Sequence, residues 1–239
     1  ENAAKRIAWS KFINNGQICI APDYVLVHKS IKEKFKKIII SKIKEYYNED
    51  VSKSSSYCRI VNKKHFNRVK LLLDDSIKNG DKVIHGGNCI EKENFIEPTI
   101  IEKVSEKSIV NHEEIFGPLL PLFEYESIDE AINFINNKEK PLALYIYSRN
   151  KNNINKIINN TSSGGVCINH SAMHYSNSNL PFGGINNSGV GKSKGIYGFE
   201  EFSNKKSVLK QNLPSATDLM MPPYNNLKQK LIDFSIKWF

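Results

Sequence analysis

The sequence predicts an α/β fold, with an open and mostly parallel sheet flanked by helices. Short apolar runs alternate along the chain with longer segments whose apolar residues recur at helical spacing. Strands that alternate with helices are typical of a parallel sheet covered on both faces. The 239 residues, with 40% hydrophobic content, are enough for one large domain, alone or with an appendage.

The first predicted helix covers residues 1–14 and is amphipathic. We expect Asn15-Gly16 to end it, because both residues tolerate positive φ. Cys19 then follows beyond a rigid support. A lone cysteine is most often a small buried hydrophobe, but a thiol is also the side chain that most readily attacks a carbonyl. The apolar face of the helix carries Ala4, Ile7, Ala8 and Phe12.

The next elements are a strand and two helices. Residues 24–28 are strand-like, and Ser30 with Glu33 predicts a capping box for a long helix. A further helix is expected over residues 64–78, ending at Gly80.

The second half of the chain repeats the alternation. A capping box of Ser127 and Glu130 predicts one helix, and Asn150 predicts the cap of another. A helical stripe of apolar residues also marks the last segment, after a linker that contains Pro and Met. Short apolar strands are predicted within residues 83–87, 98–101, 119–125, 142–148 and 164–169.

Composition favours a chain with a solvated basic surface. The net charge is +9, but the lysines are spread along helix faces among many asparagines, without an RNA-binding or helix-turn-helix pattern, so no nucleic-acid partner is predicted. Four widely spaced cysteines without a CxxC predict a reducing compartment and no metal site. No apolar run is long enough to span a bilayer. A cytoplasmic location is therefore expected.

Several ordered motifs resemble those of the aldehyde dehydrogenase superfamily, most closely its class 3 branch for fatty and aromatic aldehydes. They include FINNGQICIAPD (12–23), EEIFGPLLPL (113–122), SSGGVCIN (162–169) and LPFGGINNSGVG (180–191), in the family's order. The resemblance extends to about Leu209. It implies a catalytic domain over residues 1–205, and an oligomerisation strand with a C-terminal tail helix over 206–239.

The resemblance also implies the chemistry. The family oxidises aldehydes to carboxylic acids with NAD or NADP, through a thiohemiacetal and a thioester on a cysteine that matches Cys19. Glu114 matches the carboxylate that binds the nicotinamide ribose hydroxyls, and Phe116 matches the aromatic residue beside the nicotinamide ring. Phe182 is a candidate for lining the aldehyde pocket, with packing in the core as the alternative.

Family features are also missing. In the resembled enzymes the dinucleotide-binding domain, the glutamate general base and an oxyanion-hole asparagine precede the nucleophile, and no GxGxxG follows a strand here. We therefore expect the C-terminal catalytic half, which needs the missing half for activity. The alternative is a catalytically silent fragment that acts as a binding or oligomerisation module.

The resemblance further predicts substrates and partners. Medium-chain, long-chain or aromatic aldehydes are the expected substrates, and a homodimer is the expected assembly. Membrane association through the tail helix is an open alternative and is not predicted.

Two short motifs are set aside, together with two histidines. GVGKS (189–193) ends like a phosphate-binding P-loop, but the opening glycine of that loop would fall at Asn186 and no apolar helix follows. HEEIF (112–116) lacks the second histidine of a zinc-protease helix. His170 and His174 are interpreted as solvated loop residues, with a place at the substrate entrance as the alternative.

Overall fold

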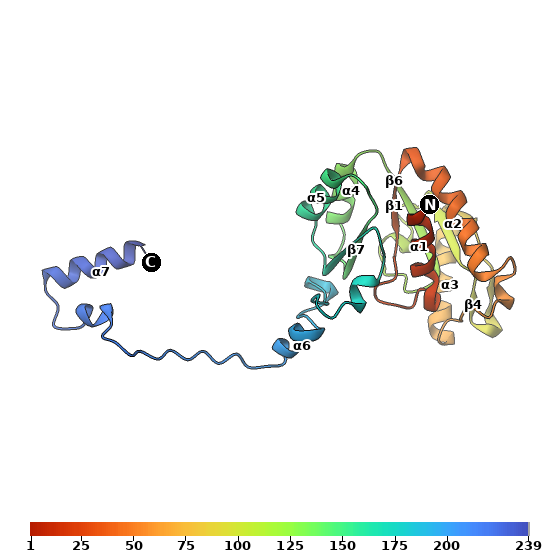
Figure 1. Cartoon of the computed structure of the whole chain (residues 1–239). Helices are drawn as coiled ribbons and strands as arrows, with labels where there is room; N and C mark the ends of the chain where they lie inside the picture. The colour runs from red at the N-terminus through yellow and green to blue at the C-terminus, as the bar shows by residue number, and fades with distance from the viewer. Residues whose placement is uncertain (239) are drawn as a thin grey trace. The chain divides into compact units, whose positions relative to one another are not determined.

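The computed structural model describes residues 1–238, which divide into two compact units, Glu1–Phe202 and a second one that begins at Ser203. The first unit contains a four-stranded sheet in the order β1-β6-β5-β2 (Figure 1). Its central pairs are parallel, and β2 is an antiparallel edge strand. The four strands are β1 (Val25–His28), β6 (Leu119–Tyr125), β5 (Thr99–Glu102) and β2 (Lys82–His85).

The remaining strands form two small sheets of their own. β7 (Ala143–Ile146) pairs in parallel with β8 (Gly165–Ile168), and β3 (Cys89–Ile90) pairs antiparallel with β4 (Phe95–Ile96). The predicted α/β class with mostly parallel pairing is therefore confirmed. The division of the strands into three separate sheets was not specified by the sequence, because an apolar run indicates that a segment is a strand but does not identify its partner.

Seven α-helices of at least seven residues occur among the described residues, six of them in the first unit. Two predicted caps are confirmed: Asn150 Oδ1 accepts the backbone N–H groups of residues 152 and 153, and Ser127 Oγ accepts that of Glu130. The helices are α1 (Asn2–Phe12), α2 (Lys32–Tyr47), α3 (Lys63–Lys78), α4 (Ile128–Asn136), α5 (Lys151–Asn160), α6 (Gly195–Glu201) and α7 (Asn226–Trp238).

The capping box predicted at Ser30 was wrong. Residues 29–31 form a separate 3₁₀ turn, and α2 begins only at Lys32. The backbone N–H of Ser30 donates to Nδ1 of His28 at 3.2 Å, so the histidine caps the turn in place of the serine.

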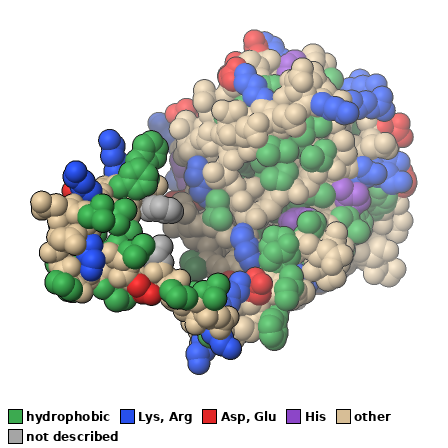
Figure 2. Space-filling model, turned by 60° about the vertical axis from the view of Figure 1, so that its left-hand side comes forward, with side chains coloured by type: hydrophobic (Ala, Val, Ile, Leu, Met, Phe, Trp, Pro, Cys, Tyr) green, Lys and Arg blue, Asp and Glu red, His purple; other side chains and the backbone are tan. Residues whose placement is uncertain are grey.

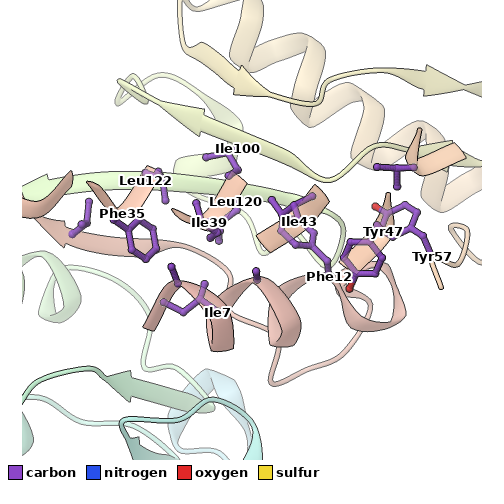
Figure 3. Close-up of a cluster of buried hydrophobic side chains, with 14 of the residues drawn as sticks. Ile7, Phe12, Phe35, Ile39, Ile43, Tyr47, Tyr57, Ile100, Leu120 and Leu122 are labelled. Carbon is purple, nitrogen blue, oxygen red and sulfur yellow. The ribbon is translucent and has the colours of Figure 1, made fainter. Parts of the chain in front are cut away.

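The core consists of two clusters that lie on opposite faces of the main sheet. α1 and α2 pack on one face with Ile39, Ile43 and Leu120, and Figure 3 shows their side chains pointing toward one another. α3 packs on the other face with Phe66 and Ile101. Neighbouring strand residues belong to different clusters because successive side chains point to opposite faces. Strands buried on both faces explain the continuous apolar runs.

The second unit is a small, exposed element. In α7 the side chains of Leu227, Phe234 and Trp238 are all exposed, and Figure 2 shows hydrophobic side chains gathered on this unit beside lysines. Residues 206–211 form no strand, and Val208 and Leu209 are 78% and 95% exposed. Within residues 1–238, none of the helices combines the length and apolar character needed to cross a bilayer.

Candidate active site

Cys19 lies in a loop that three consecutive left-handed residues turn away from the end of α1. Asn14, Asn15 and Gly16 have φ values of 49°, 60° and 72°. Asparagine and glycine adopt this conformation at the lowest cost. The thiol that follows is free and exposed.

Hydrogen bonds from polar side chains of this loop hold it against residues 58–61. Asn15 Nδ2 donates to the carbonyl of Cys58 at 2.6 Å, and Gln17 Oε1 accepts the backbone N–H of Val61 at 3.0 Å. Gln17 Nε2 also donates to the carbonyl of Arg59 at 3.2 Å. The loop is thus held on one side while the thiol stays accessible.

Two contacts join the Cys19 loop to the segment that carries Glu114 and Phe116. A Cβ atom on Gly16 would lie 2.3 Å from the carbonyl oxygen of Gly117, so the two backbones are in direct contact. On the other side of Cys19, Asp23 Oδ1 accepts the backbone N–H of Ile115 at 3.0 Å. These contacts bracket Cys19 and bring its loop against residues 114–117.

Within this segment the side chains alternate between the interior and the surface. Ile115 is fully buried, whereas Glu114 and Phe116 are exposed, Phe116 at 39%. Phe116 has a φ of 42°, a left-handed conformation that a bulky residue adopts only when its surroundings impose it. The Arg68 guanidinium binds this turn by donating to the carbonyls of Glu114 at 3.2 Å, Phe116 at 3.4 Å and Ile115.

Several charged side chains act on Glu114. Lys11 is only 1% exposed, and burial lowers its pKa to about 8, although Asp23 and Glu114 oppose the shift. Partial burial, with the nearby Asp23 carboxylate, raises the pKa of Glu114, while Arg68 and Lys11 act to lower it. Charged groups from α1 to α3 therefore act electrostatically on the Glu114 carboxylate.

Phe182 is connected to the same loop through a row of rings. Its ring centroid is 5.8 Å from that of His174, and His174 is 5.9 Å from Tyr145. Tyr145 Oη donates to the carbonyl of Ile20 at 2.7 Å, directly after Cys19. The half-buried Phe182 therefore belongs to this aromatic row, which also includes Tyr175, whose ring centroid lies 5.0 Å from that of Phe182.

One histidine prediction was wrong. His174 is only 8% exposed, and neither ring nitrogen has a hydrogen-bond partner among the described residues. Burial lowers its pKa, so the neutral ring is favoured. The cause is its position between Tyr145 and Phe182, which the polar sequence around it does not reveal.

The exposed pair Glu114 and Phe116 fits the nicotinamide nucleotide that the resemblance implies. A carboxylate offers several lone pairs to paired ribose hydroxyls, and an exposed aromatic ring offers a flat face to another ring. No cluster of three or more candidate metal ligands occurs in residues 1–238. Sequence reasoning gave no role to Asp23, although it ends the FINNGQICIAPD motif. It also missed Arg68 and Tyr145, whose hydrogen-bond partners lie far away in the sequence.

Comparison with known proteins agrees with this geometry. The Aldehyde dehydrogenase family model matches residues 1–208. The chain is 41% identical to the 4,4'-diaponeurosporen-aldehyde dehydrogenase of Staphylococcus aureus, covering 93% of the chain and 48% of that protein. It is 46% identical to the "Aldehyde dehydrogenase, dimeric NADP-preferring" of Bos taurus, covering 87% of the chain and 84% of that protein.

Structural comparison gives the same result. The substrate-bound state of Staphylococcus aureus AldH superposes with a TM-score of 0.87 and 40% identity, over 98% of this chain and 50% of that one. The chain spans about half the length of most curated relatives that it matches. With a family match over residues 1–208 and a relative that is 46% identical and covered to 84%, the chain belongs to the aldehyde dehydrogenase family.

Proposed function

We propose that this chain is the nucleophile-bearing part of an enzyme that oxidises aldehydes to carboxylic acids with NAD or NADP. The observation that carries the proposal is the exposed thiol of Cys19, whose loop is tied on both sides to the segment of Glu114 and Phe116. Membership of the family and the names of the relatives support it. We infer that activity requires a nucleotide-binding half beside this chain.

Cys19 performs the central step. Its thiolate attacks the aldehyde carbon, a sulfur–carbon bond forms, and the carbonyl oxygen takes the negative charge. The backbone N–H of Cys19 is the expected donor to that oxygen, as in the resembled enzymes. After oxidation the acyl group is a thioester on Cys19, and attack by water releases the carboxylate and the thiol. NAD or NADP, bound at Glu114 and Phe116, would supply the hydride acceptor.

The proposed substrates are medium-chain, long-chain or aromatic aldehydes. The row of Tyr145, His174, Tyr175 and Phe182 supports this choice, because an apolar aromatic wall favours an apolar chain or ring. The neutral form favoured for His174 keeps this wall uncharged.

Four free thiols support the predicted cytoplasmic location.

We also propose that residues 206–211 contact a second copy of the chain in a homodimer. The exposure of Val208 and Leu209 supports this assignment, as does the word "dimeric" in the name of the cattle relative. Sedimentation velocity tests it: Leu209→Glu is expected to convert dimers to monomers, and an unchanged sedimentation coefficient would contradict the assignment.

The decisive experiment compares two cysteine variants in the enzyme that joins this chain to its nucleotide-binding half. Cys19→Ala is expected to lower aldehyde oxidation by at least about 1000-fold, because it removes the thiol that forms the covalent intermediate. Cys58→Ala is the matched control, since Cys58 is also a free and exposed thiol. Equal turnover of Cys19→Ala and the wild type would support the silent binding or oligomerisation module instead.

A further inference from the structure

Lys192, the lysine of the GVGKS motif that was set aside, binds backbone carbonyls of its own chain. Its Nζ donates to the backbone carbonyls of Gly183 at 2.6 Å, Gly184 at 3.1 Å and Gly164 at 3.3 Å. An ammonium group has three N–H donors. All three are used within the chain, so none remains for a phosphate.

The glycines around Lys192 explain why several carbonyls converge there. A Cβ on Gly183 would lie 2.2 Å from the carbonyl oxygen of Gly191, and one on Gly184 would lie 2.0 Å from that of Ser188. A Cβ on Gly164 would lie 2.4 Å from the carbonyl oxygen of Gly183. Backbones this close bring carbonyl dipoles together, and a cation among them offsets their mutual repulsion.

The same segment fixes Phe182 from both sides. Phe182 and Ser193 exchange two backbone hydrogen bonds, at 3.0 and 2.7 Å, so the residue after Lys192 pairs with the backbone of Phe182. The residue after Phe182 is Gly183, which accepts the shortest of the Lys192 hydrogen bonds. Glu201 holds the Lys192 backbone in turn, since its Oε2 accepts the Lys192 N–H at 3.3 Å. The position of Phe182 therefore depends on the lysine.

We propose that Lys192 is a positioning residue that sets the aldehyde chain-length selectivity by fixing Phe182. The inference rests on the proposed function, in which Phe182 lines the aldehyde pocket. Its physical basis is the continuous path from the Lys192 ammonium through Gly183 to Phe182, and from there through His174 and Tyr145 to the Cys19 loop. A small shift of a pocket wall changes the fit of a long chain more than that of a short one.

Steady-state kinetics of the complete enzyme with propanal and decanal tests the proposal. Lys192→Met keeps the apolar stem and removes the three donors, and we expect it to change the ratio of the two kcat/KM values by about 10-fold. The KM for NAD or NADP and the rate of Cys19 alkylation by iodoacetamide are expected to stay within about twofold of the wild type. The control is Lys34→Met, a lysine on the exposed face of α2.

A double-mutant cycle distinguishes positioning from a general structural role. In a Phe182→Ala background, Lys192→Met is expected to leave the propanal-to-decanal ratio unchanged, because the residue that it positions is gone. Additive changes, or an unaltered ratio in the folded single variant, overturn the inference. Should Lys192→Met fail to fold by circular dichroism, Lys192→Gln provides a milder comparison, because it removes the charge and shortens the side chain but retains two donors. Failure of the proposed function is recognised separately, by full turnover of Cys19→Ala.

Discussion

The two segments beside the Cys19 loop, residues 114–117 and 180–193, are each held by a cation bound to three backbone carbonyls, but their cations come from different places. Arg68 reaches the first segment from α3, and Val69 of the same helix packs against Gly117. Lys192 belongs to the second segment itself. The first segment is therefore anchored in the core, and the second is braced locally. Disturbing the first should cost folding free energy as well as activity, whereas disturbing the second should mainly alter selectivity.

The largest expected effect tests residues 114–117, the segment that is anchored in the core. Gly16→Ala places a Cβ 2.3 Å from the Gly117 carbonyl oxygen at a φ of 72°. We expect the free energy of unfolding to fall by about 3 kcal/mol or more, since two backbones must separate. The matched control is Gly80→Ala, with a φ of 87° and no atom within 4 Å, where only the left-handed conformation costs about 1 kcal/mol. Equal losses in urea denaturation would contradict a specific contact.

The buried Lys11 gives the next effect, which depends on pH. Its pKa falls from 10.5 to about 8 in the folded chain, so between these values the unfolded state binds more protons and stability rises with pH. Below pH 8 the full penalty of burying the charge is present. We expect Lys11→Met to raise the free energy of unfolding at pH 7 by about 2 kcal/mol. The variant should also lose this part of the rise between pH 8 and 10, measured by denaturation at each pH.

Arg68 provides a third test, of about the same size. Arg68→Met leaves the carbonyls of residues 114–116 without their donor, and we expect a loss of about 2 kcal/mol in stability. Glu114 then loses its fixed position, so the KM for NAD or NADP is expected to rise about 10-fold. Arg68→Lys should restore only part of the stability and of the cofactor KM, because a lysine lacks the planar guanidinium group with its several fixed donors. An unchanged KM in the folded Met variant would show that the clamp does not serve the cofactor.

Tyr145 joins the two sides and gives the smallest effect. Tyr145→Phe removes the 2.7 Å hydrogen bond to the Ile20 carbonyl, at a cost of about 1 kcal/mol. The kcat/KM should fall about threefold for propanal and decanal alike, because the loop moves but the aldehyde wall remains. Tyr147→Phe, which removes a hydroxyl 2.6 Å from Ser171 Oγ, is the control. A change in the substrate ratio would place Tyr145 with the selectivity segment.

Much of the fold could be predicted because its signals are local. The caps at Ser127 and Asn150 depend on side chains within three residues of the helix start, so the sequence contains the whole interaction. The division into three sheets depends on which strands pair. The cap predicted at Ser30 did not form because the neighbouring His28 ring caps the turn instead. Such outcomes depend on competition between partners, which periodicity does not describe.

The candidate site was predicted less completely. Cys19, Glu114, Phe116 and Phe182 stand in motifs, and their roles remain predictions. Arg68 reaches its carbonyl partners across 46 to 48 residues of chain, and no local pattern marks it. His174 becomes buried because rings from two other segments enclose it. Side chains that act through distant backbone contacts are therefore found only once the chain is folded.

The contacts that hold the Cys19 loop on residues 58–61 also protect the chain against deamidation. Asn15-Gly16 is a dipeptide prone to deamidation, which requires the glycine nitrogen to attack the asparagine amide carbon. Here that amide is fully buried and donates to the Cys58 carbonyl, while a ψ of 26° keeps the backbone away from ring closure. Folding thus preserves an unstable dipeptide close to Cys19, and loss of the fold exposes it to a slow, irreversible change of charge.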